Sequence, residues 1–464
     1  MHPRNAKLPA KPMGAPSKTH NNNRPVATPS DTSADPEILS RGQKRQLRRD
    51  RLRARLEIEK TRLIAEETNR IYEDAAKKWA DLEAELRICI RNEMLDEVDM
   101  LYADNLKDRA WKMLTKFLQN MIGPDTHLYA HHKDSHHNYV EQLKILEQTH
   151  GDTLSIDHPD FPLSDTTFVY APGTHIGIEE ETLEILWEAR ITPWQAMNSH
   201  RRDCYIKTCN TLMEYTQSQN SKKHGTEKET NKDNQPLPRH GKMYAAGWHQ
   251  TRGEKGKDIV YYTVQKGSTV TKLLDQKEKY ERSTNNLADV AAEYAQGLQS
   301  LFPLGYKILT EFVQRNDLPS FAQLDLLHKG ELVAMPFANS LTITHSDFSN
   351  YVHCDRDAIA VAYGWWWVGY RGHSKDSWKL SLDGSFDHNQ VTGGSFLIAQ
   401  HGIAIDFARA EGLVEIYWRG KNDHHVTLAS NSPENVTRFG TSVQITQSGV
   451  GETSAKVLKY VMEF

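Results

Sequence analysis

The chain has 464 residues, of which 38% are hydrophobic and 25% charged, and its formal net charge is −4 at pH 7. This length allows two or three packed units, each with a core of its own. No stretch approaches the roughly 20 apolar residues of a membrane span, so no membrane association is expected. The N-terminus lacks the apolar segment of a secretory signal, and the few cysteines are too scattered for a disulfide framework: Cys89, Cys204, Cys209 and Cys354.

These features predict a reducing compartment, nuclear or, as the alternative, cytoplasmic.

Charge is unevenly distributed along the chain. Residues 1–60 carry 14 Lys and Arg against 6 Asp and Glu, whereas residues 243–464 carry 21 against 24. Because an excess of positive charge attracts acidic polymers, the N-terminal part is the predicted contact with nucleic acid.

Residues 1–40 are predicted to form a disordered tail, because Pro, Asn, Ser and Thr dominate and large apolar residues are almost absent. Residues 41–122 are predicted to form a basic, charged helical region, since neither Gly nor Pro occurs between Gln43 and Ile122. Its arginine-dense start, residues 41–60, is interpreted either as a nuclear-targeting or phosphate-contacting arm, or as a solvated helix face. The first alternative makes DNA the expected partner.

Residues 123–215 mix turn signals with helical runs, and we predict an α-rich accessory region there. The polar residues 216–242 are predicted to form a linker. The remaining domain, 243–464, begins with apolar residues at helical spacing from Leu287 to Leu301 and then changes to short, β-rich segments separated by Gly, Asp, Asn or Ser. This order predicts an α+β fold, with a strand sandwich or barrel and helices packed on one side.

A His-x-Asp triplet precedes the most strongly β-rich segment, "AIAVAYGWWWV". In a strand, residues two apart point to the same face, so His353 and Asp355 converge while Cys354 points away. A second histidine would complete the 2-His-1-carboxylate set that is typical of non-haem Fe(II) oxygenases. The alternative is a hydrogen-bonded pair at a strand end. Three other triplets have weaker contexts, and they begin at His132, His158 and His345.

The second histidine is predicted at His424 or His425, which follow a β-rich segment 69 and 70 residues after Asp355. This interval fits the intervening strands of a double-stranded β-helix, whose two ends come together. Farther along the chain, the guanidinium of Arg438 could bind a carboxylate bidentately, as a 2-oxoglutarate cosubstrate requires.

The segments "HCDRDAIAVAYGWWW", "GGSFLIAQHGIAIDF" and "GLVEIYWRGKNDHHVT" resemble the TET-like (TET/JBP) 2-oxoglutarate–Fe(II) oxygenase domains that are abundant in basidiomycete fungi. The resemblance covers residues 240–450 in motif order and spacing. It implies a double-stranded β-helix (jelly-roll) catalytic domain with packed helices. The C-terminal motif of that family, Trp-Arg-Gly followed by His-x-Thr, matches His425 rather than His424.

The resemblance also implies the roles of individual residues. It makes His353, Asp355 and His425 the Fe(II) ligands. It makes Arg438 the residue that binds 2-oxoglutarate, with Arg419 as the second candidate for that role.

The chain departs from the animal TET enzymes at one informative position. In those enzymes an asparagine, three residues after the metal aspartate, contacts the target base, and here that position is Ala358. The resemblance implies a dioxygenase that oxidises a methylated nucleobase, with 5-methylcytosine in DNA as the default. The alternatives are a non-catalytic TET-like module that binds nucleic acid or another partner, and an oxygenase acting on a protein or a small molecule.

Overall fold

The computed structural model describes residues 116, 119–120, 122–132, 136–180, 184–219, 221, 238, 240–250, 259–261, 270–316, 318–323, 337–372 and 377–450. The predicted tail over 1–40, the arm over 41–60 with nearly all of the helical region to 122, and most of the linker over 216–242 lie outside these residues. Within the described part, no helix combines the length and the apolar character that crossing a membrane demands.

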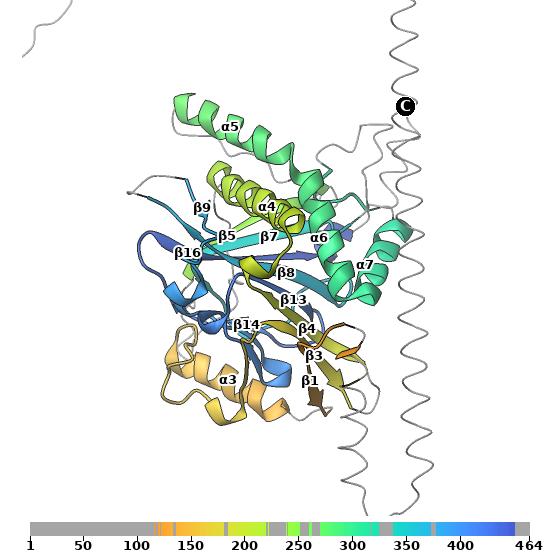
Figure 1. The fold of residues 1–464 in the computed structure, drawn as a ribbon, viewed down its shortest axis with the longest axis vertical. Coiled ribbons are helices and arrows are strands. Elements are labelled where there is room, and N and C mark those ends of the chain that lie inside the picture. The colour runs from red at the N-terminus through yellow and green to blue at the C-terminus, as the bar shows by residue number, and fades with distance from the viewer. Residues whose placement is uncertain are drawn as a thin grey trace, which may run out of the picture. The chain divides into compact units, whose positions relative to one another are not determined.

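The described residues form two facing sheets with helices on both outer sides, and a separate two-stranded sheet of residues 392–393 and 430–431 (Figure 1). The helices are α3 (His137–His150), α4 (Ser199–Ser218), α5 (Val270–Thr284), α6 (Leu287–Leu301), α7 (Pro303–Arg315) and α8 (Gln447–Val450). The first strands are β1 (Thr126–His131), β2 (Thr167–Val169), β3 (Gly173–Glu179), β4 (Ile185–Thr192), β5 (His240–Gln250), β6 (Ile259–Tyr261), β7 (Ser340–Ser349) and β8 (Val361–Tyr370). The later strands are β9 (Lys379–Leu380), β10 (Thr392–Gly393), β11 (Phe396–Ile398), β12 (Ile403–Ile405), β13 (Leu413–Arg419), β14 (Val426–Thr427), β15 (Ser430–Asn431) and β16 (Val436–Gln444).

The main sheet has the strand order β1-β3-β4-β13-β8-β16-β7-β5-β6, with β9 paired to β8. Strand β8 shows why the tryptophan run forms the centre of this sheet. Trp365 and Trp367 pack against helices α4, α6 and α7, whereas Trp366 packs into the space between the two sheets. A strand turns successive side chains to opposite faces, so a continuous apolar run marks a strand that is buried on both sides.

The smaller sheet has the strand order β14-β11-β12-β2 and faces the main sheet. Phe396 and Ile398 on β11 pack toward the main sheet, against Trp418 among others. Leu397, between them, packs outward against Leu143 of α3. Helix α3 therefore covers the outer face of the smaller sheet, opposite the helices that cover the main sheet (Figure 1). This mixed α+β architecture with large sheets is consistent with a double-stranded β-helix.

The region 123–215, for which the sequence predicts an α-rich accessory unit, contains helix α3 and most of α4, but it also supplies strands β1 to β4. Strand β3 pairs with β4, β4 pairs with β13, and β2 pairs with β12, so this region completes both sheets. Strand β4 reads "ILWEARIT", in which Leu, Glu, Ala and Arg all favour helices. Pairing with β13, more than 200 residues later, overrides that local preference.

An ion pair buried on the helix side ties three strands of the main sheet together. Glu415 on β13 accepts hydrogen bonds from Arg190 on β4 at 2.6 and 2.8 Å and from the hydroxyl of Tyr363 on β8 at 2.6 Å. Burial would raise the pKa of Glu415, but Arg190 lowers it below its ordinary value. A buried pair of this kind is costly to break, because either partner alone would be an uncompensated buried charge.

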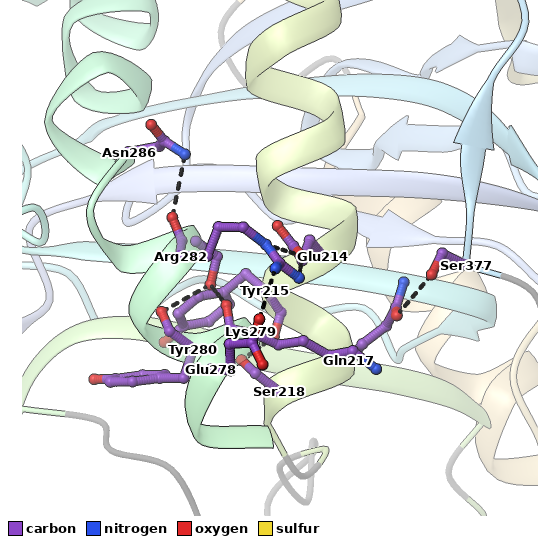
Figure 2. Close-up of polar contacts among 11 residues, drawn as sticks. Glu214, Tyr215, Gln217, Ser218, Glu278, Lys279, Tyr280, Arg282, Asn286 and Ser377 are labelled. Carbon is purple, nitrogen blue, oxygen red and sulfur yellow. Dashed lines mark hydrogen bonds and ion pairs between the residues drawn. The ribbon is translucent and has the colours of Figure 1, made fainter. Parts of the chain in front are cut away.

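Helix α5 is joined to α4 by polar contacts at the edge of the helical layer (Figure 2). The guanidinium of Arg282 on α5 donates to Glu214 on α4, with an Nε–Oε1 distance of 2.7 Å. Gln217 near the end of α4 accepts from Ser377, which precedes β9, at 3.3 Å. The helical layer is thereby linked both within itself and to the strand edge.

Candidate metal centre

Three residues from two distant segments of the chain converge: His353 and Asp355 from one, and His425 from the other. The Nε2 atom of His353 lies 3.5 Å from one carboxylate oxygen of Asp355, and Nε2 of His425 lies 3.3 Å from the other. One ligand atom from each residue can be chosen so that all lie within 4.8 Å of one another. Among the described residues this is the one group of three or more His, Cys, Asp or Glu with such spacing.

Hydrogen bonds fix the tautomer of both imidazoles. Nδ1 of His353 lies 2.7 Å from the carbonyl oxygen of Tyr351, and Nδ1 of His425 lies 2.9 Å from that of Asp423. A carbonyl oxygen only accepts, so each Nδ1 carries the proton and donates it. Whenever such an imidazole is neutral, its lone pair is on Nε2, which is the form in which histidine binds a metal.

Backbone pairing brings the three residues together. His353 and His425 form an isolated antiparallel bridge, with N–O distances of 3.1 and 2.9 Å, and the amide of Asp355 donates to the carbonyl of Gly420 at 2.8 Å. The sequence predicted that the His-x-Asp pair enters a strand directly. The structure instead holds the pair in this bridge, and β8 begins only at Val361.

Electrostatics around the bridge favour one ionised carboxylate. Burial raises the pKa of Asp355, but the neighbouring His425 and His353 outweigh that effect and hold the pKa below its ordinary value. Asp357 behaves oppositely, because burial and then the charge of Asp355 raise its pKa well above the ordinary range. Its carboxylate oxygens have no hydrogen-bond partner within the described part of the chain. This environment therefore favours the neutral form of Asp357.

His424 lies outside the cluster, with its Nδ1 3.2 Å from the side-chain oxygen of Gln400. The guanidinium of Arg419 is likewise paired with residues outside the cluster. Its guanidinium donates to both carboxylate oxygens of Asp423, at 2.9 and 2.8 Å, and to Glu184 at 2.9 Å. Arg419 is one of the two arginines that the sequence predicts as carboxylate receptors. Its hydrogen bonds instead stabilise the loop that carries His425.

Arg438 has a different environment, buried between the two sheets on β16. Its guanidinium carbon lies 5.1 Å from the centre of the Phe407 ring. Its four hydrogen bonds go to neutral acceptors: the ring Nδ1 of His388 and the carbonyls of His388, Val391 and Gly393. Burial lowers the pKa of Arg438 to about 9, which leaves it charged at neutral pH.

The hydrogen bonds of Arg438 within the protein limit how its guanidinium could bind a carboxylate. A guanidinium has five N–H groups, so the four bonds leave one N–H, on Nη1, together with a positive charge that no carboxylate pairs with among the described residues. In this arrangement a carboxylate at Arg438 would receive one charge-assisted hydrogen bond and not the predicted bidentate pair.

Ala358, where the resemblance implies the position of the base-contacting asparagine of animal TET enzymes, packs against the helix-side core. Its amide donates to the carbonyl of Ile445 at 2.7 Å, and its carbonyl accepts from Lys421 at 3.1 Å.

Sequence reasoning missed two residues near the arginine and the metal cluster. His388, which orients Arg438, has no distinguishing pattern, whereas Asp423 stands directly before the histidine pair and could have been noticed.

Comparison with known proteins places these observations in a family. The family description "Tet-like 2OG-Fe(II) oxygenase superfamily" matches residues 198–430, which is half of the chain. A solved structure of NgTET1 in complex with 5mC DNA is similar at 10% sequence identity and a TM-score of 0.34, and covers 71% of this chain and 100% of that chain. No curated protein matches the chain. The chain belongs to the Tet-like 2OG-Fe(II) oxygenase superfamily, whose cofactors are Fe(II) and 2-oxoglutarate.

Proposed function

We propose that this protein is an Fe(II)- and 2-oxoglutarate-dependent dioxygenase that oxidises a methylated nucleobase, with 5-methylcytosine in DNA as the first substrate to test. His353, Asp355 and His425 are the proposed Fe(II) ligands, and Arg438 the proposed receptor for the cosubstrate. The observation that carries the proposal is the convergence of two imidazole nitrogens and one carboxylate in a chain of the Tet-like superfamily.

The donor set fits the metal. Two neutral imidazoles and one carboxylate form the facial set of non-haem Fe(II) oxygenases, which leaves other positions of the metal open. The side chain of His425 is 4% exposed, whereas that of His353 is 31% exposed, so the centre has one buried and one accessible side. Substrate would approach from the side of His353.

Iron bound there would supply the chemistry: with 2-oxoglutarate and dioxygen, one oxygen atom would enter a C–H bond of the substrate, and the other would enter the succinate that forms as 2-oxoglutarate loses CO2. The residues of the chain hold and orient the reactants. Each histidine keeps its proton on Nδ1, and the charge of Arg438 attracts a carboxylate of the cosubstrate. Rings of Phe396 and Trp418, centred 5.7 and 5.9 Å from that of His425, form an apolar inner wall that excludes water.

Gly420 limits the space around Asp355. A Cβ at Gly420 would lie 2.7 Å from Oδ2 of Asp355. We expect Gly420→Ala to turn the carboxylate and to weaken Co(II) binding about 10- to 100-fold, as loss of ligand orientation does elsewhere. Titration followed by visible absorption measures the affinity. Asn422→Ala, at an exposed position of the same loop, is the matched control, and equal affinities for both variants would contradict the proposed crowding.

The identity of the target base has less support than the metal centre. Ala358 faces the core, so in this chain position 358 offers no group to read a base. A base in duplex DNA must also be flipped out of the stack to reach a metal centre. The predicted DNA contact of residues 41–60 and the nuclear location remain proposals, since those residues lie outside the described part.

Mass spectrometry of nucleosides tests the substrate, after incubation of methylated duplex DNA with protein, Fe(II) and 2-oxoglutarate. We expect oxidised 5-methylcytosine from the wild type and none from His353→Ala. Iron binding with succinate release but no oxidised base would favour a different substrate, a protein or a small molecule. Absence of both iron binding and succinate release would favour the non-catalytic module.

A further inference from the structure

Helix α3 lies outside the residues that the family description matches, yet it contacts the segment that carries two of the proposed ligands. The carboxylate of Glu147, near the end of α3, accepts the backbone N–H of Val352 with both oxygens, at 2.9 and 3.2 Å. Glu147 is 4% exposed. A buried carboxylate on a backbone amide forms a charge-assisted hydrogen bond, roughly twice as strong as a neutral one.

The amide that Glu147 holds belongs to a peptide group with a second role. The N–H of Val352 and the carbonyl of Tyr351 are the two ends of one planar peptide unit. That same carbonyl accepts the Nδ1 proton of His353 at 2.7 Å. A continuous chain therefore runs from the Glu147 carboxylate through one peptide group to the imidazole of His353.

This chain has two physical consequences. The planar peptide cannot rotate while its N–H is held, so its carbonyl stays aimed at Nδ1 and fixes the orientation of the ring. A negative charge at the N–H end also polarises the peptide and strengthens its carbonyl as an acceptor, because hydrogen bonds in series reinforce one another. A stronger acceptor at Nδ1 makes the opposite nitrogen, Nε2, a better electron donor.

We propose that Glu147 is a positioning residue of the metal centre, acting on His353 through the 351–352 peptide group. The inference rests on the proposed function, because it takes His353 as a metal ligand. It assigns a task to the region before residue 198: α3 covers the smaller sheet and also orients a ligand.

The test uses Co(II) binding to the full chain, followed by its visible absorption, with Glu147→Gln and Glu147→Ala. We expect Glu147→Ala to weaken Co(II) binding about 10- to 100-fold, the range for loss of an outer-shell partner. Glu147→Gln keeps one oxygen acceptor without the charge and should lie between alanine and wild type. The matched control is Glu141→Gln on the same helix, an exposed residue paired with Lys144 at 3.1 Å, which should bind Co(II) like the wild type.

A double-mutant cycle separates positioning from a purely structural role. In a His353→Ala background, Glu147→Gln should have no further effect on residual Co(II) binding, because the route through His353 is gone. If Glu147→Gln lowers the thermal stability of the metal-free protein but leaves Co(II) affinity and absorption unchanged, the positioning role is wrong. If Glu147→Ala does not fold, Glu147→Gln and the double-mutant cycle test the positioning role. Failure of the wild type to bind Co(II) would instead overturn the proposed function itself.

Discussion

Alanine in place of His353, Asp355 or His425 is expected to abolish the visible charge-transfer band that Fe(II) and 2-oxoglutarate give together under anaerobic conditions. Each substitution removes one of three protein ligands, so metal affinity should fall by more than the roughly 100-fold that loss of an outer-shell partner can cost. The geometry predicts similar losses at all three positions, since the carboxylate of Asp355 lies 3.5 and 3.3 Å from the two imidazole nitrogens.

His424→Ala is the matched control for this experiment. It removes the neighbouring histidine, which faces Gln400 instead of the cluster, so the band should persist. A band that survives in His425→Ala and disappears in His424→Ala would reverse the assignment of the second histidine. No band in the wild-type protein would remove the oxygenase proposal.

Arg438→Met is expected to weaken 2-oxoglutarate binding by about 10- to 100-fold, while Co(II) binding in the absence of 2-oxoglutarate stays close to that of the wild type. The reason is the loss of one charge-assisted hydrogen bond, which contributes about 1.5–3 kcal/mol. Titration of the charge-transfer band with 2-oxoglutarate gives the affinity. Arg438→Lys keeps the charge but not the guanidinium N–H, so it should recover part of the affinity.

Arg409→Met provides the control for removal of an arginine. Arg409 is 47% exposed and its guanidinium lies 3.8 Å from the centre of the Tyr170 ring, so the variant should bind 2-oxoglutarate normally. Equal affinity in Arg438→Met and the wild type would show that the cosubstrate is held elsewhere. Since Arg419 pairs with Asp423 and Glu184, such a result would not transfer the role to Arg419 without a rearrangement of that network.

The local sequence pattern was sufficient to predict several helices and strands. The apolar spacing from Leu287 to Leu301 coincides with the bounds of α6, and the tryptophan run lies in β8 as a central strand. Both features depend on side chains a few residues apart, which share a helix face or alternate across a strand. The strands of 123–215 lacked such a signal, because β4 contains good helix formers and acquires its strand conformation by pairing with β13.

The sequence by itself determined the chemical types at the site: a His-x-Asp pair, a histidine pair at a matching distance, and two arginines. Tertiary structure decided among them. It brought His425 rather than His424 to Asp355, paired Arg419 with carboxylates, and buried Arg438 without one. It also placed the Glu147 carboxylate on the N–H of the 351–352 peptide group, whose carbonyl accepts the hydrogen bond from His353. Sequence spacing cannot specify the contacts of His425 with Asp355, of Arg419 with Glu184 and of Glu147 with Val352, since each joins segments far apart in the chain whose approach depends on the packing of both sheets.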